Sequence, residues 1–231
     1  MQDDFVQRVF GTELPYDATI LDAGCGVGCH LASLNVAHKI GLDISTQNLT
    51  SAKKQFRNID FILGDTEELP FRNDSFDAVL IVSLLHHIEN HDKAIVELFR
   101  VLKPSSCILI SDSSINGVKL IYPVASLIVQ LSHKIGGYES FGPRLDLLKT
   151  SLFNAGFKIS MSRISGSFMI FICQSLIGLL NRIGVGSRFQ KVIKSVEAVF
   201  RCVDRFVCSY LDLEVYGIWF DMACIRKVRA L

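Results

Sequence analysis

Five short apolar runs, separated by amphipathic stretches, occupy the first 112 residues of this chain. The runs predict strands at 19–23, 38–43, 60–63, 76–82 and 107–111. Helices are expected between them at 27–36, after an N-cap at Ser45, and at 92–102 with Asp92 as the N-cap. Strands that alternate with helices form an open, mostly parallel sheet with helices on both faces. The chain is therefore predicted to have an α/β fold.

The regular alternation of predicted strands and helices ends at Asp112, and longer, more apolar segments follow. Helices are expected at 144–155, 168–183 and 188–211, and strands at 157–164 and 218–227. The sequence has no internal repeat and no Pro/Ser-rich linker. Residues 1–231 are therefore predicted to form a single domain with helical insertions late in the sheet.

Composition narrows the classes of protein to which the chain can belong. Its 231 residues are 49% apolar and 20% charged, which excludes a disordered or collagen-like protein. A formal net charge of +1 provides no overall field to attract nucleic acid, so no nucleic-acid partner is expected. Seven cysteines without a CxxC pair indicate a reducing compartment, and a cytoplasmic location is expected.

One segment approaches the length of a membrane span. Residues 164–181 are 18 residues without a charge, which is near the lower limit for a transmembrane helix. Glycine, serine and glutamine residues interrupt the segment at 166, 167, 174, 175 and 178. We interpret it as soluble or interfacial rather than spanning.

A glycine-rich loop at 24–28 follows the first predicted strand. Glycines let the backbone approach a ligand closely, and the following helix start offers free N–H groups. A dinucleotide loop would have its third glycine where this chain has Cys29, and Asp22 would repel a pyrophosphate. The loop therefore favours a cationic ligand with an amino group, with a tight structural turn as the alternative.

Asp43 ends the second predicted strand, 19 residues after Gly24. A carboxylate at this position is suited to bind the two hydroxyls of a ribose. The alternative is an exposed acid at a helix start, where it interacts favourably with the helix dipole.

Between residues 19 and 112 the chain resembles a known family in five motifs: LDAGCGVG at 21–28, GLDIS at 41–45, GDTEELPF at 64–71, SFDAVLIVSLLHHI at 75–88 and LFRVLKPSSCILISD at 98–112. The family is the class I S-adenosylmethionine-dependent methyltransferases, and more narrowly the branch of the ubiquinone and menaquinone methyltransferases. One departure is Pro104-Ser105-Ser106, where the family usually has a proline followed by glycines.

The resemblance implies a Rossmann-like, seven-stranded, mostly parallel sheet whose last strand, here 218–227, is antiparallel to the others. It also implies a cofactor-binding half at 1–112 and an acceptor-side half at 113–231. Helical insertions are expected in the second half at about 113–143 and 165–217.

The resemblance also implies which residues would contact the cofactor, S-adenosyl-L-methionine. Around its methionine part it places Asp22 and the backbone of Gly24, Gly26 and Gly28. Asp43 would hold both ribose hydroxyls and Ile44 would lie against the adenine. Asp65 would face the adenine amino group with the Thr66 N–H nearby, and Ser83 would line the methionine end.

His86 and His87 follow the fourth predicted strand, at the edge of the sheet where open α/β folds bind ligands. They are candidates to face the methyl acceptor, because methylation of oxygen benefits from a base of near-neutral pKa. A structural histidine at the corner is the alternative. His87 and His91 could share a helical face, but Glu89 does not fit H-E-x-x-H, so no metal is predicted.

The insertions are apolar, with long runs at 120–131 and 168–180. Such segments suit a small hydrophobic or lipid-like acceptor, and basic residues near 182–194 could meet a membrane surface. The alternatives are packing of the helices on each other or on a second subunit in a homodimer. A non-catalytic partner subunit with the cofactor fold and a dinucleotide oxidoreductase remain the rival functions.

Overall fold

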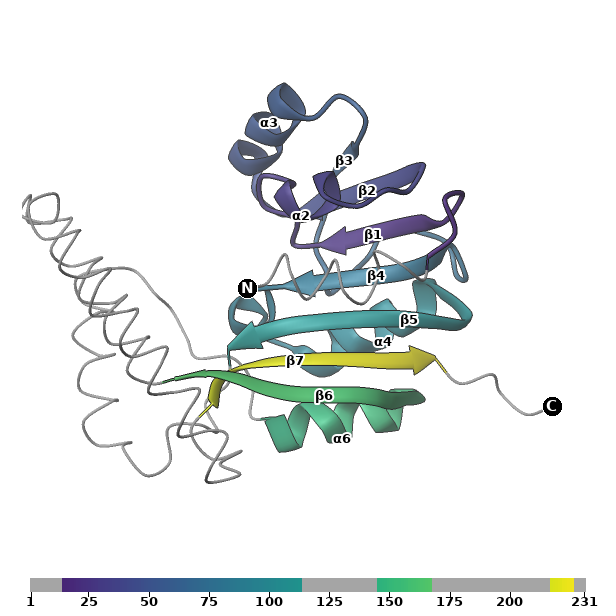
Figure 1. The fold of residues 1–231 in the computed structure, drawn as a ribbon, viewed down its shortest axis with the longest axis vertical. Coiled ribbons are helices and arrows are strands. Elements are labelled where there is room, and N and C mark those ends of the chain that lie inside the picture. The colour runs from purple at the N-terminus through teal and green to yellow at the C-terminus, as the bar shows by residue number, and fades with distance from the viewer. Residues whose placement is uncertain (1–13, 114–144, 168–216, 227–231) are drawn as a thin grey trace, which may run out of the picture. The chain divides into compact units, whose positions relative to one another are not determined.

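A computed structural model describes residues 14–113, 145–167 and 217–226 of the chain. The strands of its sheet are β1 (Thr19–Ala23), β2 (His38–Asp43), β3 (Asp60–Leu63), β4 (Phe76–Val82), β5 (Leu102–Ser113), β6 (Phe157–Ser167) and β7 (Gly217–Arg226). They form one seven-stranded sheet in the order β3-β2-β1-β4-β5-β7-β6 (Figure 1). The described residues are therefore organised around a single sheet, as predicted.

The strand order reverses direction between β1 and β4. β1 pairs in parallel with both β2 and β4, and the pairs β2–β3 and β4–β5 are also parallel. The arrow of β7 points opposite to those of β4 and β5 (Figure 1). The predicted mixed sheet with an antiparallel last strand is thus confirmed, and its switch point lies at β1 and β4.

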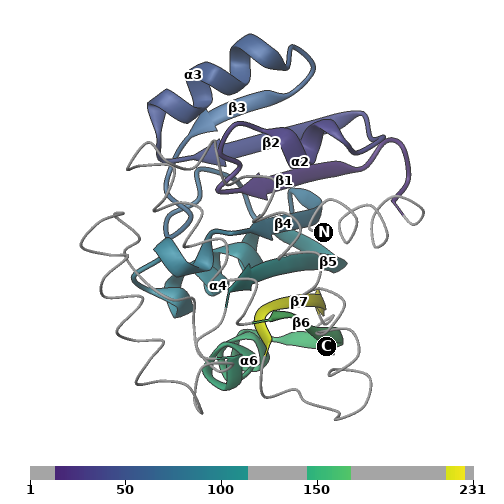
Figure 2. The same ribbon diagram turned by 60° about the vertical axis from the view of Figure 1, so that its left-hand side comes forward.

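Helices α2 (Cys29–Ala32), α3 (Thr46–Gln55), α4 (His91–Val101) and α6 (Leu145–Ala155) flank the sheet. Leu31 of α2 and Leu49 of α3 share a buried cluster with Ile20 and Leu80 of the central strands. α4 and α6 lie on the same side of β5, β6 and β7 (Figure 2), where Phe99 packs edge-on against Phe157 at 5.1 Å between ring centroids. β4 is buried almost throughout, as its continuous apolar run predicts.

Local structure differs from the sequence predictions at two helices. The helix expected at 27–36 is only four residues long, because Ser33 and Leu34 donate to the carbonyls three residues before them and tighten the chain into a turn. Asn90, rather than Asp92, caps α4, and its side chain accepts from Lys93 N at 3.0 Å. Ser45 caps α3 as predicted, accepting from Asn48 N at 3.2 Å.

β5 begins at Leu102, five residues earlier than the predicted strand, and its pairing with β4 shifts register between Phe76 and Ala78. Ser105 in this irregular stretch has φ +66°. That conformation favours glycine, which the family usually has after the proline. The departure lies at the start of β5, away from the carboxyl ends of the strands.

The segments up to Asp112, Asp146–Arg163 and from Asp221 onward belong to one compact unit. Ser113–Leu145 and Ile164–Phe220 are grouped as a second unit, of which few residues are described. The helices predicted at 168–183 and 188–211 and the insertion at 113–143 lie outside the described residues, apart from Ser113. Within the described residues, no helix has the length and apolar character needed to cross a membrane.

Candidate functional site

The carboxyl ends of β1, β2, β4 and β5 meet at one edge of the sheet, around the switch point between β1 and β4. Open α/β sheets bind their ligands in the crevice at such a point. Every site residue predicted from the sequence lies in this edge or in a loop that leaves it. The topology therefore brings the predicted site residues to the edge of the sheet that is formed by the carboxyl ends of its strands.

The glycine loop bends sharply across the end of β2. The N–H groups of Gly24 and Cys25 both donate to the Leu42 carbonyl, at 2.8 and 2.9 Å. Gly24, Gly26 and Gly28 have φ of +76°, +54° and +83°, values that side chains disfavour. The path of the loop therefore requires glycine at these three positions.

The three glycines differ in what surrounds them. A Cβ on Gly24 would meet Leu84 Cδ1 at 2.5 Å, and one on Gly28 would meet Phe61 Cζ at 2.8 Å. A Cβ on Gly26 would meet nothing within 4 Å among the described residues. Gly24 and Gly28 thus make room for neighbouring side chains, whereas Gly26 leaves the backbone open to a ligand.

Asp43 holds the loop to the start of α3. Its Oδ2 accepts from Gly26 N and its Oδ1 from Ser45 N, each at 2.8 Å. The carboxyl is buried, with 8% of the residue exposed, so the alternative of an exposed acid at a helix start is wrong. Oδ1 also accepts from Asn48 Nδ2 at 3.5 Å, whereas Oδ2 keeps a lone pair that can accept from a ligand hydroxyl.

Asp22 is completely buried, and neither of its oxygens has a hydrogen-bond partner among the described residues. Burial, and next the charge of Asp43, raise the pKa of Asp22 to about 8. The pKa of the Cys25 thiol is raised as well, by burial and then by the charges of Asp22 and Asp43. A buried carboxyl without a partner is costly, and a cationic ligand group would relieve that cost.

Two exposed apolar side chains stand beside Asp43. Ile44 is 74% exposed, and Leu63, which pairs with Asp43 in the β2–β3 register, is 55% exposed. Leu63 was not among the predicted site residues. Leu63 ends β3, and the sequence shows this strand end. That β3 lies next to β2, and so places Leu63 beside Asp43, is known only from the strand order.

Asp65 and Thr66 begin the loop after β3. Asp65 is exposed, and its Oδ1 accepts from Glu67 N at 2.8 Å, while Thr66 is buried. Farther along, Arg100 of α4 donates to the carbonyls of Leu69 and Phe71, at 3.0 and 2.7 Å. The loop is thus fastened to α4 downstream of the two candidate residues.

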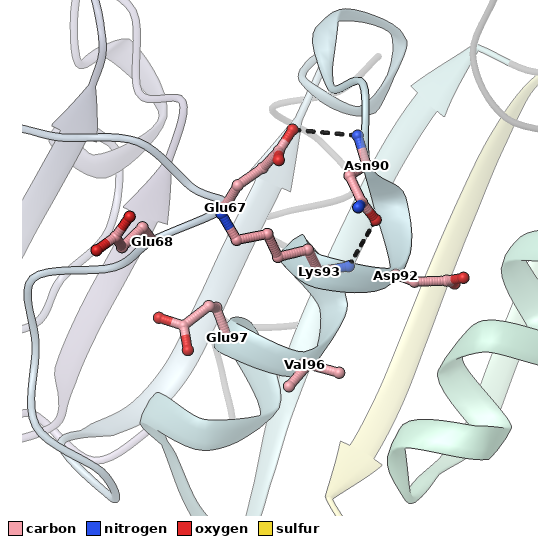
Figure 3. A pocket seen from close by; sticks show the side chains of 7 residues that line it. All are labelled: Glu67, Glu68, Asn90, Asp92, Lys93, Val96 and Glu97. Carbon is pink, nitrogen blue, oxygen red and sulfur yellow. Dashed lines mark hydrogen bonds between the residues drawn. The ribbon is translucent and has the colours of Figure 1, made fainter.

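An open, acidic depression lies between this loop and the start of α4 (Figure 3). Asn90 N donates to Glu67 Oε1 at 3.1 Å across it. Its lining residues are Glu67, Glu68, Asn90, Asp92, Lys93, Val96 and Glu97. None of these belongs to the predicted site, and the depression is distinct from the glycine loop.

Ser83 follows β4 at φ +54°, and its N–H donates to the Ser111 carbonyl at 2.9 Å. A short 3₁₀ turn, η1 (Leu85–His87), comes next. His86 Nδ1 lies 2.7 Å from Asp112 Oδ1, and His87 is exposed with its ring 4.1 Å from that of His86. Sequence reasoning missed Asp112, although it ends the strand next to β4.

His87 belongs to η1 and His91 begins α4, so the two histidines do not lie on one helix. The Nε2 atom of His91 is 2.8 Å from the Leu85 carbonyl, a polar contact that joins α4 to the turn η1. Within residues 14–113, 145–167 and 217–226, no three potential metal-ligating side chains come together.

An open glycine loop, a buried acid that has no hydrogen-bond partner among the described residues, and a second acid clamped beside it are typical of an α/β protein that binds a nucleoside-containing ligand. The chain matches the family model of the methyltransferase domain over residues 21–110. It is 30% identical over 175 residues to the demethylmenaquinone methyltransferase of Oceanobacillus iheyensis, which covers 64% of this chain and 73% of that relative. The chain belongs to the class I S-adenosylmethionine-dependent methyltransferases.

Other similarities fit the family and leave the acceptor undetermined. The chain is 35% identical over 105 residues to tRNA (carboxymethyluridine(34)-5-O)-methyltransferase of Arabidopsis thaliana, covering 44% of this chain and 26% of that relative. A solved structure of an S-adenosylmethionine-dependent methyltransferase from Methanosarcina mazei has a TM-score of 0.63 at 16% identity, covering 96% of this chain and 98% of that one. The chain spans 26% to 45% of the length of the first four curated relatives that it matches.

Proposed function

We propose that this protein binds S-adenosyl-L-methionine at the switch point and transfers its methyl group to a small, hydrophobic or lipid-like acceptor. The observation that carries the proposal is the geometry around Asp43. Its carboxylate is held by the N–H groups of Gly26 and Ser45, and the space over Gly26 is open among the described residues. A ligand that lies over Gly26 can therefore reach the remaining lone pair of Asp43 Oδ2.

The chain's own residues fit the cofactor at both of its ends. Asp22 would receive the methionine ammonium group, because a cation supplies the partner that this buried carboxyl lacks among the described residues. Asp43 would accept from the two ribose hydroxyls. Ile44 and Leu63 would cover the adenine with apolar surface, and Asp65 and the Thr66 N–H would approach its polar edge. Ser83 and the backbone of Gly24, Gly26 and Gly28 would complete the methionine end.

When bound, the cofactor supplies a methyl group made electrophilic by the positive sulfur. The chain contributes position, because an in-line displacement needs its nucleophile about 3 Å from the reacting carbon. His86 and His87 follow β4 on the same edge and would face the acceptor. Asp43 places negative charge beside the ligand, and a cationic group of the ligand would favour release of the proton that buried Asp22 holds.

The proposal on the acceptor rests on the apolar runs at 120–131 and 168–180, together with the similarity to a demethylmenaquinone methyltransferase. We also propose a single domain, with cofactor binding in 1–112 and acceptor binding in 113–231. We propose a cytoplasmic location from the seven cysteines without a CxxC pair. Contact with a membrane surface and a homodimer are also proposals, and they depend on segments outside the described residues.

Titration calorimetry with S-adenosylhomocysteine tests the proposal. We expect wild-type protein to bind, and Asp43→Ala to weaken binding at least about tenfold, because the variant loses a charged acceptor of ligand hydrogen bonds. Asp60→Ala, an exposed acid at the start of β3, is the matched control and should bind like the wild type.

If the wild type and Asp43→Ala bind S-adenosylhomocysteine with equal enthalpy and equal affinity, Asp43 does not contact the ligand. Absence of any heat with folded wild-type protein would contradict the proposal and favour a non-catalytic partner subunit that keeps the cofactor fold. Circular dichroism melting of each variant separates loss of binding from loss of folding.

A further inference from the structure

The strongest polar arrangement outside the proposed cofactor contacts joins the end of β5 to the turn after β4. Asp112 is completely buried at the end of β5. Its Oδ2 accepts from the Leu85 N–H at 2.5 Å, and its Oδ1 is 2.7 Å from His86 Nδ1. One carboxylate thus contacts two nitrogen atoms on consecutive residues of η1.

This arrangement decides which ring nitrogen of His86 carries the proton. A carboxylate only accepts hydrogen bonds, so Nδ1 of the neutral ring must be the donor. The basic lone pair of neutral His86 is then on Nε2. The side chain of His86 is 16% exposed, so the ring is not sealed in the core.

The turn that holds His86 is fixed on several sides. The Leu85 carbonyl contacts His91 Nε2 at 2.8 Å, while the Leu85 N–H is bound to Asp112. Just before the turn, Ser83 N donates to the Ser111 carbonyl at 2.9 Å. Asp112 of β5 therefore orients the ring, and His91 of α4 fixes the turn that carries it, which is the condition for an oriented base.

We propose that Asp112 is a positioning residue that holds His86 in the Nδ1–H form, with Nε2 as a general base, and that the acceptor carries an acidic hydroxyl group. The inference rests on the proposed function, because it concerns the acceptor of the same methyl transfer. It selects His86 over His87, because the Asp112 carboxylate contacts the His86 ring while His87 is exposed.

The methyl transfer begins from the neutral His86 ring. His86 Nε2 takes the proton of the acceptor hydroxyl as an oxygen lone pair forms the bond to the methyl carbon. The bond between sulfur and methyl breaks, and its electron pair stays on sulfur, which becomes neutral. The His86 imidazolium is stabilised by the Asp112 carboxylate and releases its proton to water.

Among the residues that the structure describes, the titratable groups near the His86 ring come from three elements. They are Asp112 on β5, the neighbouring His87 in η1 and, through the Leu85 carbonyl, His91 on α4. Asp112 contacts the ring directly at Nδ1, whereas His91 acts through the Leu85 backbone. A change at Asp112 should therefore alter the proton position in the ring more than a change at His91.

Nuclear magnetic resonance of the cofactor-free protein tests this directly. Two-bond nitrogen–proton correlations distinguish the two neutral histidine tautomers, and the His86→Gln variant assigns the His86 signals among the six histidines. We expect neutral His86 to carry its proton on Nδ1. A proton on Nε2 in the wild-type protein would overturn the proposal, whatever any variant does.

The Asp112→Asn variant tests whether Asp112 sets the proton position in the His86 ring. The Leu85 N–H can only donate, so the amide oxygen of the new side chain must face it, and the amide NH₂ must face His86 Nδ1. Nδ1 then becomes an acceptor, and the proton of neutral His86 should move to Nε2. Asp92→Asn, which alters an exposed acid in the first turn of α4, should leave the proton on Nδ1. Retention of the Nδ1 proton in folded Asp112→Asn would contradict the assignment.

The acceptor class is tested with methyl-labelled S-adenosylmethionine and a cell extract. We expect the labelled product to be a methyl ether, and Asp112→Asn to form it about a hundredfold more slowly with unchanged affinity for S-adenosylhomocysteine. An N-methyl, S-methyl or C-methyl product, or an undiminished rate in Asp112→Asn, would overturn this inference. Failure of the wild type to bind S-adenosylhomocysteine would instead overturn the proposed function and leave the tautomer result standing.

Discussion

Among single residues, Gly26 and Gly28 illustrate how one motif combines two roles. Both have positive φ, so each avoids a backbone strain that a side chain would introduce. Phe61 occupies the space beside Gly28, whereas no described residue occupies the space beside Gly26. Gly28 therefore serves packing, and Gly26 is the position where a ligand can approach.

Alanine substitutions should separate these two roles. Gly26→Ala should cost about 1–2 kcal/mol of unfolding free energy through φ alone and should weaken S-adenosylhomocysteine binding at least about tenfold. Gly28→Ala should be the less stable variant, because its new methyl group meets Phe61 at 2.8 Å. Urea denaturation and calorimetry measure the two effects, and a Gly26→Ala variant with wild-type affinity would show that the ligand does not cross this part of the loop.

Sequence reasoning succeeded at positions whose role is local. The Ser45 cap follows from a serine before an amphipathic stretch, and the place of Asp43 follows from a strand end at the right distance from the glycine loop. It failed at the N-cap of α4. Both Asn90 and Asp92 are residue types that cap helices, and the path of the backbone decides which of them lies just outside the helix. Asp112 and Leu63 were missed because their meaning depends on a neighbouring strand.

Among the elements, α4 controls the loop that carries Asp65 and Thr66. Arg100 binds the carbonyls of Leu69 and Phe71, and Glu97 accepts from Leu69 N at 2.9 Å. A hydrogen bond from Arg100 lowers the pKa of Glu97, so the pair stays charged in the neutral range. One helix face thus holds a loop that would otherwise have few backbone partners.

Removing the guanidinium should release this loop. Arg100→Met should speed amide hydrogen exchange across 65–73 and lower the free energy of unfolding by about 1–2 kcal/mol, since two backbone carbonyls lose a donor. Affinity for S-adenosylhomocysteine should fall a few-fold. Lys53→Met, which removes an exposed basic residue from α3, is the control, and equal exchange in both variants would mean that the loop holds its conformation without α4.

In the molecule as a whole, Asp22 makes the stability of the fold depend on pH. Its pKa is about 8 in the folded protein, against an ordinary value of 3.8, because it is buried and lies near Asp43. Between these two values the folded chain keeps a proton that the unfolded chain releases. The contribution of Asp22 to the free energy of unfolding is therefore complete at low pH and declines as the pH rises through this window.

Asp22→Asn should remove that decline in the cofactor-free protein. We expect its stability relative to the wild type to increase by about 1 kcal/mol per pH unit between about pH 5 and 8. Urea denaturation at four pH values measures the difference, with Asp60→Asn as the control for an exposed acid. The same variant should bind S-adenosylhomocysteine more weakly, and stability curves that stay parallel across the range would show that Asp22 is ionised in the folded state.

Local patterns in the sequence were enough to predict the class of fold, because periodicity and strand ends constrain the backbone wherever the chain folds. The family was predicted from the resemblance of five motifs. The local patterns also showed which side chains stand at the ends of strands. Which of those ends are neighbours became visible only in the folded chain, where His86 meets Asp112 and Asp43 pairs with Leu63. Burial and hydrogen-bond partners arise from contacts between distant segments, and these contacts set the charge state of Asp22 and the proton position in His86.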